Sequence, residues 1–281
     1  MKSFYVTANG IRFHILGDGP EEEPLVLLLH GFPEFSYAWH RQLPVLAAAG
    51  YRAWAPDLRG YNLSDKPRGV RNYHLLTLAR DVRELIRAAG VERAVVIGHD
   101  WGAIIAWRFA MEYPQALSKL VILNVPHPGK YAAGVHNPRQ LMRSWYIGLF
   151  QIPWLPEYLL SHNSRSWAEE LRRAMIRQDR FTEADAEAYA RAMAQPGAMR
   201  AAVDYYRAFA RWGFWLPVKL IHAPTLMIWG ENDVALEKSL TYNTEKFVSN
   251  FRVHYIPHCG HWVQNEAPEE VNKTLLEFLQ G

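Results

Sequence analysis

Short apolar runs of strand length alternate with segments of helical periodicity along most of the chain. Runs at 25–29, 51–55 and 94–97 are each bounded by turn residues, and between the last two a helical apolar period stops at Gly90. A parallel pair of strands needs a crossover connection, which is usually a helix. The alternation therefore predicts an α/β fold, with a mostly parallel central sheet and helices on both faces.

The alternation is interrupted in the middle of the chain. It ends after a strand at 120–123 and resumes with a strand at 225–229, followed by one more strand and a C-terminal helix. Because the interruption lies between strands of one sheet, we expect an inserted cap and not a separate tail. We therefore divide the chain into a core, 1–126 and 219–281, and an all-helical cap, 127–218.

Helices alone are predicted within the cap. They begin near Pro138, Ser166, Thr182 and Gly197. The second and third starts have the form of a capping box, in which Ser166 is followed by Glu169 and Thr182 by Asp185. The helix from Pro138 is expected to run to the neighbourhood of Pro153.

Composition restricts the kind of protein and its partners. With 281 residues and 49% hydrophobic content, the chain can bury one large core and a small second subdomain. The 31 Lys and Arg are scattered among 28 Asp and Glu without a basic block, which argues against nucleic acid and predicts an uncharged substrate. The lone Cys259 allows no internal disulfide, and no apolar run is long enough for a membrane span. We expect a cytoplasmic monomer or homodimer.

The segment at 98–102 reads Gly-His-Asp-Trp-Gly, follows the apolar strand at 94–97 and opens a helix. Enzymes of the α/β class present a nucleophile on such a strand–turn–helix elbow, most often a serine. A carboxylate with an ordinary pKa of about 3.9 is already an anion at neutral pH and needs no base to activate it. Asp100 is therefore predicted to attack a saturated carbon, in an epoxide or an alkyl halide. The alternative, an aspartate that only caps the helix, is disfavoured by the strand before it.

Candidate partners of Asp100 follow other predicted strands. Asp233 ends a Gly-Glu-Asn-Asp segment after the strand at 225–229, and His261 lies between the last strand and the C-terminal helix. The chain order of nucleophile, acid and histidine is the one expected for this architecture, with His261 as the base and Asp233 orienting its ring. His258 is the alternative base. Backbone N–H groups of Phe32 and Trp101 are the candidate oxyanion hole.

A metal site is the competing interpretation of the histidine-rich end of the chain. His254, His258, Cys259 and His261 have ligand-type side chains. A strand followed by a loop does not gather such residues on one face, as a helix would, and no carboxylate motif accompanies them. We therefore expect no metal and no cofactor.

Taken together, these segments resemble the epoxide hydrolases of the α/β-hydrolase superfamily, in particular soluble epoxide hydrolase, over nearly the whole chain. The matching segments are His-Gly-Phe-Pro-Glu at 30–34, Asp-Leu-Arg-Gly-Tyr at 57–61, 98–103, 230–233 and 260–261. The resemblance implies the α/β-hydrolase fold and a cis bond between Phe32 and Pro33. It departs at Asn62, where the family commonly has glycine; asparagine tolerates positive φ best among the alternatives.

The resemblance also implies two cap tyrosines that protonate the epoxide oxygen. Tyr146 matches the first, in a Tyr-x-x-x-Phe-Gln stretch followed closely by proline, and Tyr206 precedes Arg207 as the second does. Their neighbours Trp145 and Tyr205 are the alternatives. Spacing alone does not select two residues among 14 tyrosines.

The predicted reaction converts a small hydrophobic epoxide and water to a vicinal diol through a hydroxyalkyl ester on Asp100. Water activated by His261 and Asp233 then hydrolyses the ester. Aromatic residues are expected to line a hydrophobic substrate tunnel, among them Trp145, Phe150 and Trp262.

Two alternatives use the same fold. The first is a dehalogenase. Haloalkane dehalogenases usually have asparagine where this chain has Phe32. Haloacetate dehalogenases have arginine where this chain has Trp101 and Ile104, and they lack the first cap tyrosine. A non-catalytic ligand receptor would be free to lose Asp100, Asp233 or His261, and all three are present.

Overall fold

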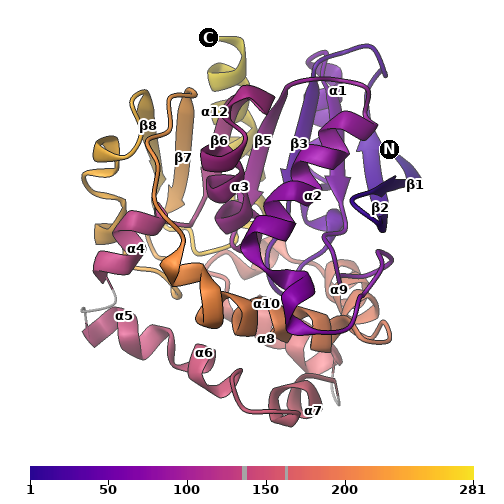
Figure 1. Ribbon diagram of the computed structural model, residues 1–281, viewed down its shortest axis with the longest axis vertical. Helices are drawn as coiled ribbons and strands as arrows, with labels where there is room; N and C mark the ends of the chain where they lie inside the picture. Colours follow the sequence, from indigo (N-terminus) through magenta and orange to yellow (C-terminus); the bar gives the residue numbers. More distant parts are fainter. Residues whose placement is uncertain (135–137, 162–163) are drawn as a thin grey trace.

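An eight-stranded sheet forms the centre of the computed structural model, which describes residues 1–134, 138–161 and 164–281 (Figure 1). The strand order is β1-β2-β4-β3-β5-β6-β7-β8. The pairs β1–β2 and β2–β4 are antiparallel and the other five are parallel. The strands span Lys2–Ala8 (β1), Ile11–Asp18 (β2), Leu25–Leu29 (β3), Arg52–Pro56 (β4), Ala94–His99 (β5), Leu117–Leu123 (β6), Thr225–Gly230 (β7) and Phe251–Ile256 (β8). The mostly parallel sheet predicted from the alternation is confirmed.

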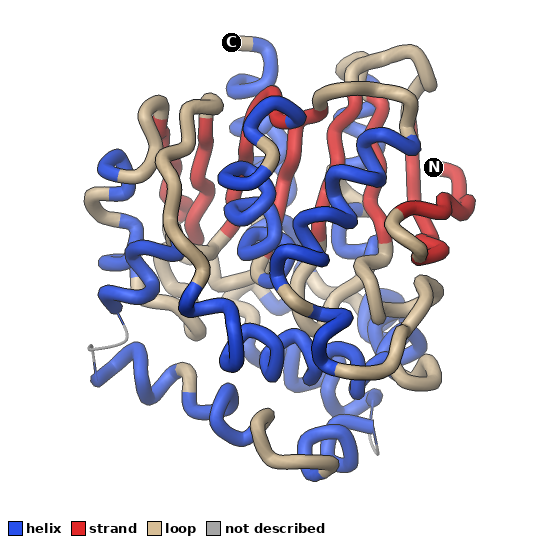
Figure 2. Tube along the Cα trace, viewed as in Figure 1, coloured by secondary structure: helices blue, strands red, loops and turns tan. Residues whose placement is uncertain are grey.

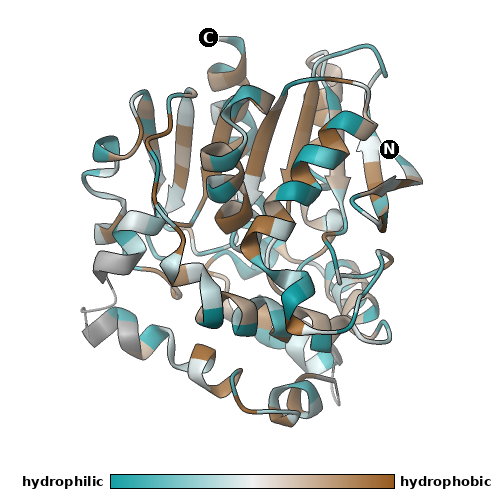
Figure 3. Cartoon of the chain, viewed as in Figure 1, coloured by the Kyte–Doolittle hydropathy of each residue, from teal (hydrophilic) through white to brown (hydrophobic). Residues whose placement is uncertain are grey.

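Helices cover both faces of this sheet. Alternate residues of β3 divide between two cores: Leu27 and Leu29 pack with α2 and α3, whereas Val26 and Leu28 pack with α1 and α12. All five residues of β3 are consequently buried, which explains why the central strands are continuous apolar runs (Figure 3). The core helices span Leu43–Ala48 (α1), Leu75–Ala88 (α2), Trp101–Glu112 (α3), Val263–Glu266 (α11) and Pro268–Gln280 (α12), and short 3₁₀ turns (η1–η3) cover Ser36–Trp39, Val70–Tyr73 and Pro114–Ala116.

The segment between β6 and β7 gathers beyond the carboxyl ends of the parallel strands (Figure 2). Every regular element described within it is helical, and the cap boundaries at 127 and 218 stay a prediction. Across the described residues, no helix combines the length and hydropathy needed to cross a bilayer. The cap helices span Pro128–Gly134 (α4), Pro138–Arg143 (α5), Trp145–Leu149 (α6), Leu155–Ser161 (α7), Ser164–Ala174 (α8), Glu183–Met193 (α9) and Ala198–Trp212 (α10), followed by a 3₁₀ turn at Gly213–Trp215 (η5).

Two details of the predicted cap are wrong and one is confirmed. The helix from Pro138 does not continue toward Pro153, because the backbone leaves the helical region at Ser144, where φ is −97° and ψ is 11°. Ser166 lies inside α8 and does not cap it; residues three apart face each other within a helix, so the same pattern arises there. The capping box of Thr182 and Asp185 is present at the start of α9.

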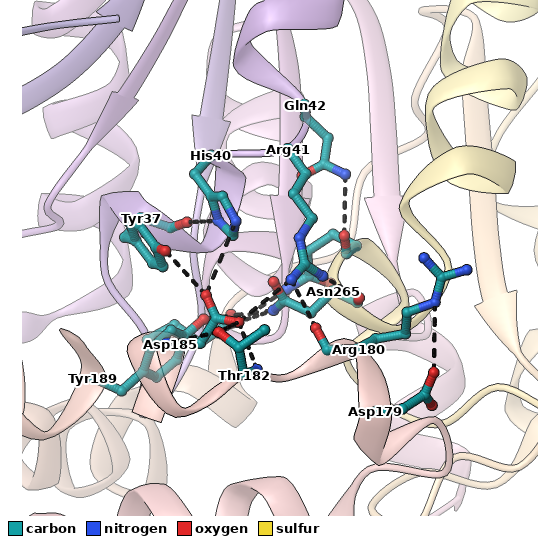
Figure 4. Close-up of polar contacts among 12 residues, drawn as sticks. Tyr37, His40, Arg41, Gln42, Asp179, Arg180, Thr182, Asp185, Tyr189 and Asn265 are labelled. Carbon is teal, nitrogen blue, oxygen red and sulfur yellow. Dashed lines mark hydrogen bonds and ion pairs between the residues drawn. The ribbon is translucent and has the colours of Figure 1, made fainter. Parts of the chain in front are cut away.

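The start of α9 is tied to the core through buried Asp185 (Figure 4). The Tyr37 hydroxyl donates to Asp185 Oδ1 at 3.0 Å, and Arg41 Nη2 donates to Asp185 Oδ2 at 3.3 Å. Arg41 also donates to the carbonyl oxygens of Arg180 in the cap and Asn265 in the core, at 2.7 and 2.8 Å. These contacts hold one side of the cap over the ends of the strands.

Candidate active site

Asp100 occupies a strained turn between β5 and α3, with φ 48° and ψ −118°. Such a conformation costs a non-glycine residue about 1–3 kcal/mol. The flanking glycines permit it, since a Cβ on Gly102 would lie 2.1 Å from the Leu29 carbonyl oxygen and a Cβ on Gly98 would lie 2.5 Å from the Gly102 oxygen. The turn therefore fixes the Asp100 carboxyl at the carboxyl end of the central strands.

Asp100 has different partners for its two oxygens. Oδ1 accepts a hydrogen bond from the Phe32 N–H at 2.7 Å, and Oδ2 lies 3.6 Å from His261 Nε2. Burial by itself raises the pKa of Asp100, but the hydrogen bond and the charge of His261 outweigh burial and hold that pKa below its ordinary value. Asp100 is thus an anion at neutral pH. The Trp101 N–H lies in the first turn of α3, where helical N–H groups lack an intrahelical partner.

His261 lies between two carboxylates. Its Nδ1 donates to Asp233 Oδ2 at 2.7 Å, while Nε2 faces Asp100. Burial lowers the pKa of His261, and the charge of Asp233 with the contacts to Asp100 more than reverses this, so its pKa is well above the ordinary value. The alternative base, His258, is exposed and lies outside the cavity described below.

Asp233 is held by a residue for which the sequence predicted no role. Asn124 Nδ2 donates to Asp233 Oδ2 at 2.6 Å, and the backbone N–H groups of Ala235 and Leu236 donate to Oδ1 at 2.7 and 2.9 Å. Asn124 directly follows β6 and has a φ of 50°. An asparagine at the carboxyl end of a buried strand was the available signal, because asparagine tolerates positive φ.

The two predicted tyrosines lie together above Asp100. Tyr146 comes from α6 and Tyr206 from α10, and their ring centroids are 5.8 Å apart. Burial raises the pKa of both phenols well above the ordinary value, so both hydroxyls stay protonated and can donate. Of the two alternatives, Trp145 is 67% exposed, and the Tyr205 hydroxyl donates to the Arg59 carbonyl oxygen at 2.7 Å, outside the cavity.

A mostly apolar cavity of about 120 Å³ connects these groups. Among the described residues its wall comprises Leu75, Asp100, Trp101, Ile104, Trp107, Arg108, Val125, Pro126, Pro128, Tyr131, Tyr146, Ile147, Tyr206, Phe209, Gly213, Phe214, Leu216, Val218, Ala235, Leu236 and His261.

The three residues predicted to bind substrate are not on this wall. Trp145 faces solvent. Phe150 is buried behind Tyr206, with ring centroids 4.8 Å apart, and Trp262 packs edge-on against His261 at 5.1 Å. Phe150 and Trp262 thus support residues of the site from behind. Adjacent residues of a helix point about 100° apart, so one of the pair Trp145–Tyr146 faces the cavity and the other does not.

Comparison with known proteins agrees with this geometry. A family model described as alpha/beta hydrolase fold matches residues 24–268. The chain is 38% identical to human epoxide hydrolase 4, over 97% of this chain and 76% of that protein. The chain belongs to the epoxide hydrolase family of the alpha/beta hydrolase fold. It is also 40% identical to the AB hydrolase superfamily protein YfhM of Bacillus subtilis (strain 168), over 100% of this chain and 99% of that one. The crystal structure of a Bacillus megaterium epoxide hydrolase in complex with an inhibitor superimposes with a TM-score of 0.90 at 30% identity, covering 99% of this chain and 100% of that one.

Two backbone features implied by the resemblance to epoxide hydrolases are present. The Phe32–Pro33 peptide bond is cis, and Asn62 has a φ of 38°. The Asn62 side chain donates to Asp57 Oδ2 at 2.8 Å. Asp57 is not one of the predicted catalytic residues, so the replacement of the family glycine by Asn62 does not alter them.

Behind the site of this epoxide hydrolase family member lies a buried polar network. His99 Nε2 donates to the His261 carbonyl oxygen at 2.9 Å, and His99 Nδ1 is 2.7 Å from Glu34 Oε2. Glu34 in turn accepts from the Gly31 N–H at 3.1 Å and from Gln264 Nε2 at 3.0 Å. The network joins the loop after β3, the elbow and the histidine loop. His99 and Glu34 belong to the matching segments at 98–103 and 30–34, but no local pattern predicts this contact between them.

Proposed function

We propose that this protein hydrolyses epoxides to vicinal diols through a covalent ester on Asp100. The observation that carries this proposal is the placement of the protonated Tyr146 and Tyr206 on the same cavity as the Asp100 carboxylate. An epoxide between them has a nucleophile for its carbon and proton donors for its oxygen. General acid assistance of this kind contributes about 10²- to 10⁴-fold in rate.

The first step forms the ester. Asp100 Oδ2 attacks an epoxide carbon, the ring C–O bond breaks, and one tyrosine gives its proton to the oxygen that leaves the carbon. Oδ1 becomes the ester carbonyl oxygen and keeps the hydrogen bond from the Phe32 N–H. It is therefore already placed for the second step, in which that oxygen becomes an anion. One oxyanion donor lowers such a barrier by about 3 kcal/mol.

The second step breaks the ester. Esterification neutralises Asp100 and removes its contribution to the high pKa of His261, so the imidazolium gives its proton to solvent and the neutral imidazole acts as a base. His261 takes a proton from water, and the water oxygen attacks the ester carbon. Of the two water protons, one goes to the departing diol oxygen and the other restores the tyrosine. His261 takes a proton back from solvent once the Asp100 carboxylate is restored.

Removing the tyrosine hydroxyls should slow the first step. We expect Tyr146→Phe and Tyr206→Phe each to lower the rate of ester formation by roughly tenfold to a hundredfold, and the double variant by about 10²- to 10⁴-fold. Rapid-quench measurement of a single turnover separates this step from ester hydrolysis, which should change little. Tyr205→Phe is the matched control, because its hydroxyl contacts the Arg59 carbonyl and not the cavity. A double variant that forms ester at the wild-type rate would rule out the acid role.

Acidification should slow ester hydrolysis before it slows ester formation. The pKa of Asp100 is below its ordinary value and the pKa values of the tyrosines are above theirs, so the attacking anion and both acids persist across neutral pH. Hydrolysis needs neutral His261, whose protonated fraction rises as the pH falls. Quench-flow at mildly acidic and mildly alkaline pH should therefore show more accumulated ester in acid. Equal accumulation at both pH values would contradict the role of His261 as base.

The positions at which dehalogenases hold a halide or a carboxylate carry apolar side chains in this chain. The Phe32 ring packs against Tyr206 at 5.7 Å, and Ile104 contributes an aliphatic side chain to the cavity wall. Parallel assays for diol from an aryl epoxide and for halide from a chloroalkane or fluoroacetate test the proposed function. Halide release without diol would favour the dehalogenase, and activity on none of these substrates would favour a receptor.

A further inference from the structure

Ser3, His14 and Asp57 form a hydrogen-bonded cluster at the antiparallel edge of the sheet, where β1 and β2 lie (Figure 1). Ser3 belongs to β1, His14 to β2, and Asp57 directly follows β4, the next strand in the sheet. Ser3 Oγ lies 2.7 Å from His14 Nε2, and His14 Nδ1 lies 2.7 Å from Asp57 Oδ2. None of the three is among the described residues of the cavity wall, so the cluster takes no part in the reaction proposed above.

The directions of these hydrogen bonds are those of a Ser-His-Asp triad. The Asp57 carboxylate can only accept hydrogen bonds, so His14 Nδ1 donates to it. In the neutral imidazole Nε2 is then the acceptor, and the Ser3 hydroxyl donates to it. A histidine held in this tautomer by a buried carboxylate is the base that activates serine on several unrelated folds, and such triads are recognised by their geometry and not by their position in the sequence.

Asp57 is well placed to fix the His14 ring. It is fully buried, and its Oδ1 accepts from the Ser36 N–H at 2.9 Å while its Oδ2 also accepts from Asn62 Nδ2 at 2.8 Å. Burial by itself raises the pKa of Asp57, but the hydrogen bond and charge of His14, with the Ser36 N–H, outweigh burial and hold that pKa below its ordinary value. Asp57 is therefore an anion at neutral pH, as the acid of a triad has to be.

Burial increases from the serine to the aspartate. Ser3 is exposed, His14 is 7% exposed, and its ring packs edge-on against Tyr5 with centroids 5.4 Å apart. A reagent in solvent consequently reaches the Ser3 hydroxyl directly. Consecutive N–H groups of a strand point to opposite edges, so one of the N–H groups of Ser3 and Phe4 points away from β2, on the open edge of the sheet. A backbone N–H of this kind can donate to an oxygen that becomes negative.

We propose that Ser3, His14 and Asp57 form a second nucleophilic site, which takes an acyl or phosphonyl group from small activated donors. The Ser3 oxygen bonds to the acyl carbon or to phosphorus, the bond to the leaving group breaks, and His14 passes the hydroxyl proton to the leaving group. Because Ser3 lies on an exposed strand, the site selects a donor by its small size and reactivity and not by its shape. The inference is independent of the proposed epoxide hydrolysis, since the two sites share no residue.

A second serine–histidine pair provides a control within the same molecule. Ser249 Oγ lies 3.1 Å from His222 Nδ1, and both residues are exposed. Within the described part of the chain no carboxylate pairs with His222, so this pair has the serine and the histidine of a triad without the acid. Removing the acid of a triad lowers its rate by about 10⁴-fold. We therefore expect Ser3 to react faster than Ser249 by about 10²-fold or more.

Labelling of the full chain with a small alkyl fluorophosphonate tests the site. The phosphonyl group stays on the serine oxygen while fluoride leaves, and peptide mass spectrometry locates and times the label. His14→Gln should lower the rate of labelling at Ser3 by about 10²- to 10⁴-fold, the usual contribution of a general base, and leave Ser249 unchanged. His222→Gln is the matched control variant, and it should leave the labelling of Ser3 unchanged.

Labelling of Ser3 no faster than Ser249 would overturn the proposal and leave the cluster as a tie between β1 and Asp57. This comparison is made within the wild type, so it decides the question even if His14→Gln does not fold. Equal labelling of Ser3 in the wild type and in folded His14→Gln would also overturn it. Because the readout is a label on Ser3 and not epoxide turnover, failure of this proposal and failure of the proposed function are seen separately.

Discussion

Asp100→Asn is expected to lower diol formation by about 10⁴-fold or more, because the amide has no anionic oxygen to attack the epoxide. Asparagine has the shape of aspartate and tolerates positive φ, so the elbow between β5 and α3 should keep its conformation. Initial rates with an aryl epoxide measure the loss, and an unchanged thermal unfolding midpoint shows that the variant is folded. Near-wild-type turnover by this variant would exclude Asp100 as the nucleophile.

Isotope labelling asks whether the Asp100 carboxylate bonds to the substrate or only activates a water. In a single turnover of the wild type in water labelled with heavy oxygen, the ester pathway puts the label into Asp100 and unlabelled carboxylate oxygen into the diol. Peptide mass spectrometry locates the label. A labelled diol in the first turnover would mean that water attacks the epoxide directly, with Asp100 as a base.

The core of the fold and the ends of its strands could be predicted because their signals are local. β3 and β5 are buried on both faces, so they appear in the sequence as unbroken apolar runs. Asp100 and Asp233 each follow such a strand, and His261 follows the edge strand β8. The carboxyl ends of parallel strands meet at one edge of a sheet, so residues far apart in sequence converge there. In the structure His261 contacts both Asp100 and Asp233, and so joins the three residues.

The cap could be predicted less well because its helices are short and its contacts are long-range. Periodicity did not show the break at Ser144, which divides the expected helix into α5 and α6. It also did not show which of Trp145 and Tyr146 faces inward, since this depends on how α6 packs over the core. Resemblance, and not spacing, singled out Tyr146 and Tyr206.

Residues that position other residues of the site were the hardest to predict from the sequence. Asn124 orients Asp233, and Glu34 with His99 braces the loop of His261, through contacts between separate strand ends. Such roles depend on three-dimensional neighbours that no local pattern encodes.

His261→Gln should stop the reaction at the ester. Glutamine cannot accept the proton of the attacking water, so ester hydrolysis should fall by about 10²- to 10⁴-fold, which is the usual contribution of a general base. Ester formation should continue, and intact-mass spectrometry after exposure to an epoxide should show a protein heavier by one substrate. Peptide mapping should place the adduct on Asp100. A folded variant that remains unmodified would contradict the two-step mechanism.

The pH of this experiment matters, because His261 holds the pKa of Asp100 down. Without the imidazole, burial raises that pKa, and a protonated Asp100 would fail to attack for a reason unrelated to the mechanism. Mildly alkaline buffer keeps Asp100 ionised and leaves the protonated tyrosines intact, since their pKa values are raised. His258→Gln is the matched control: the same replacement three residues away, on an exposed side chain outside the cavity, should turn over substrate normally. If the adduct accumulates with His258→Gln and not with His261→Gln, the base is His258 and not His261.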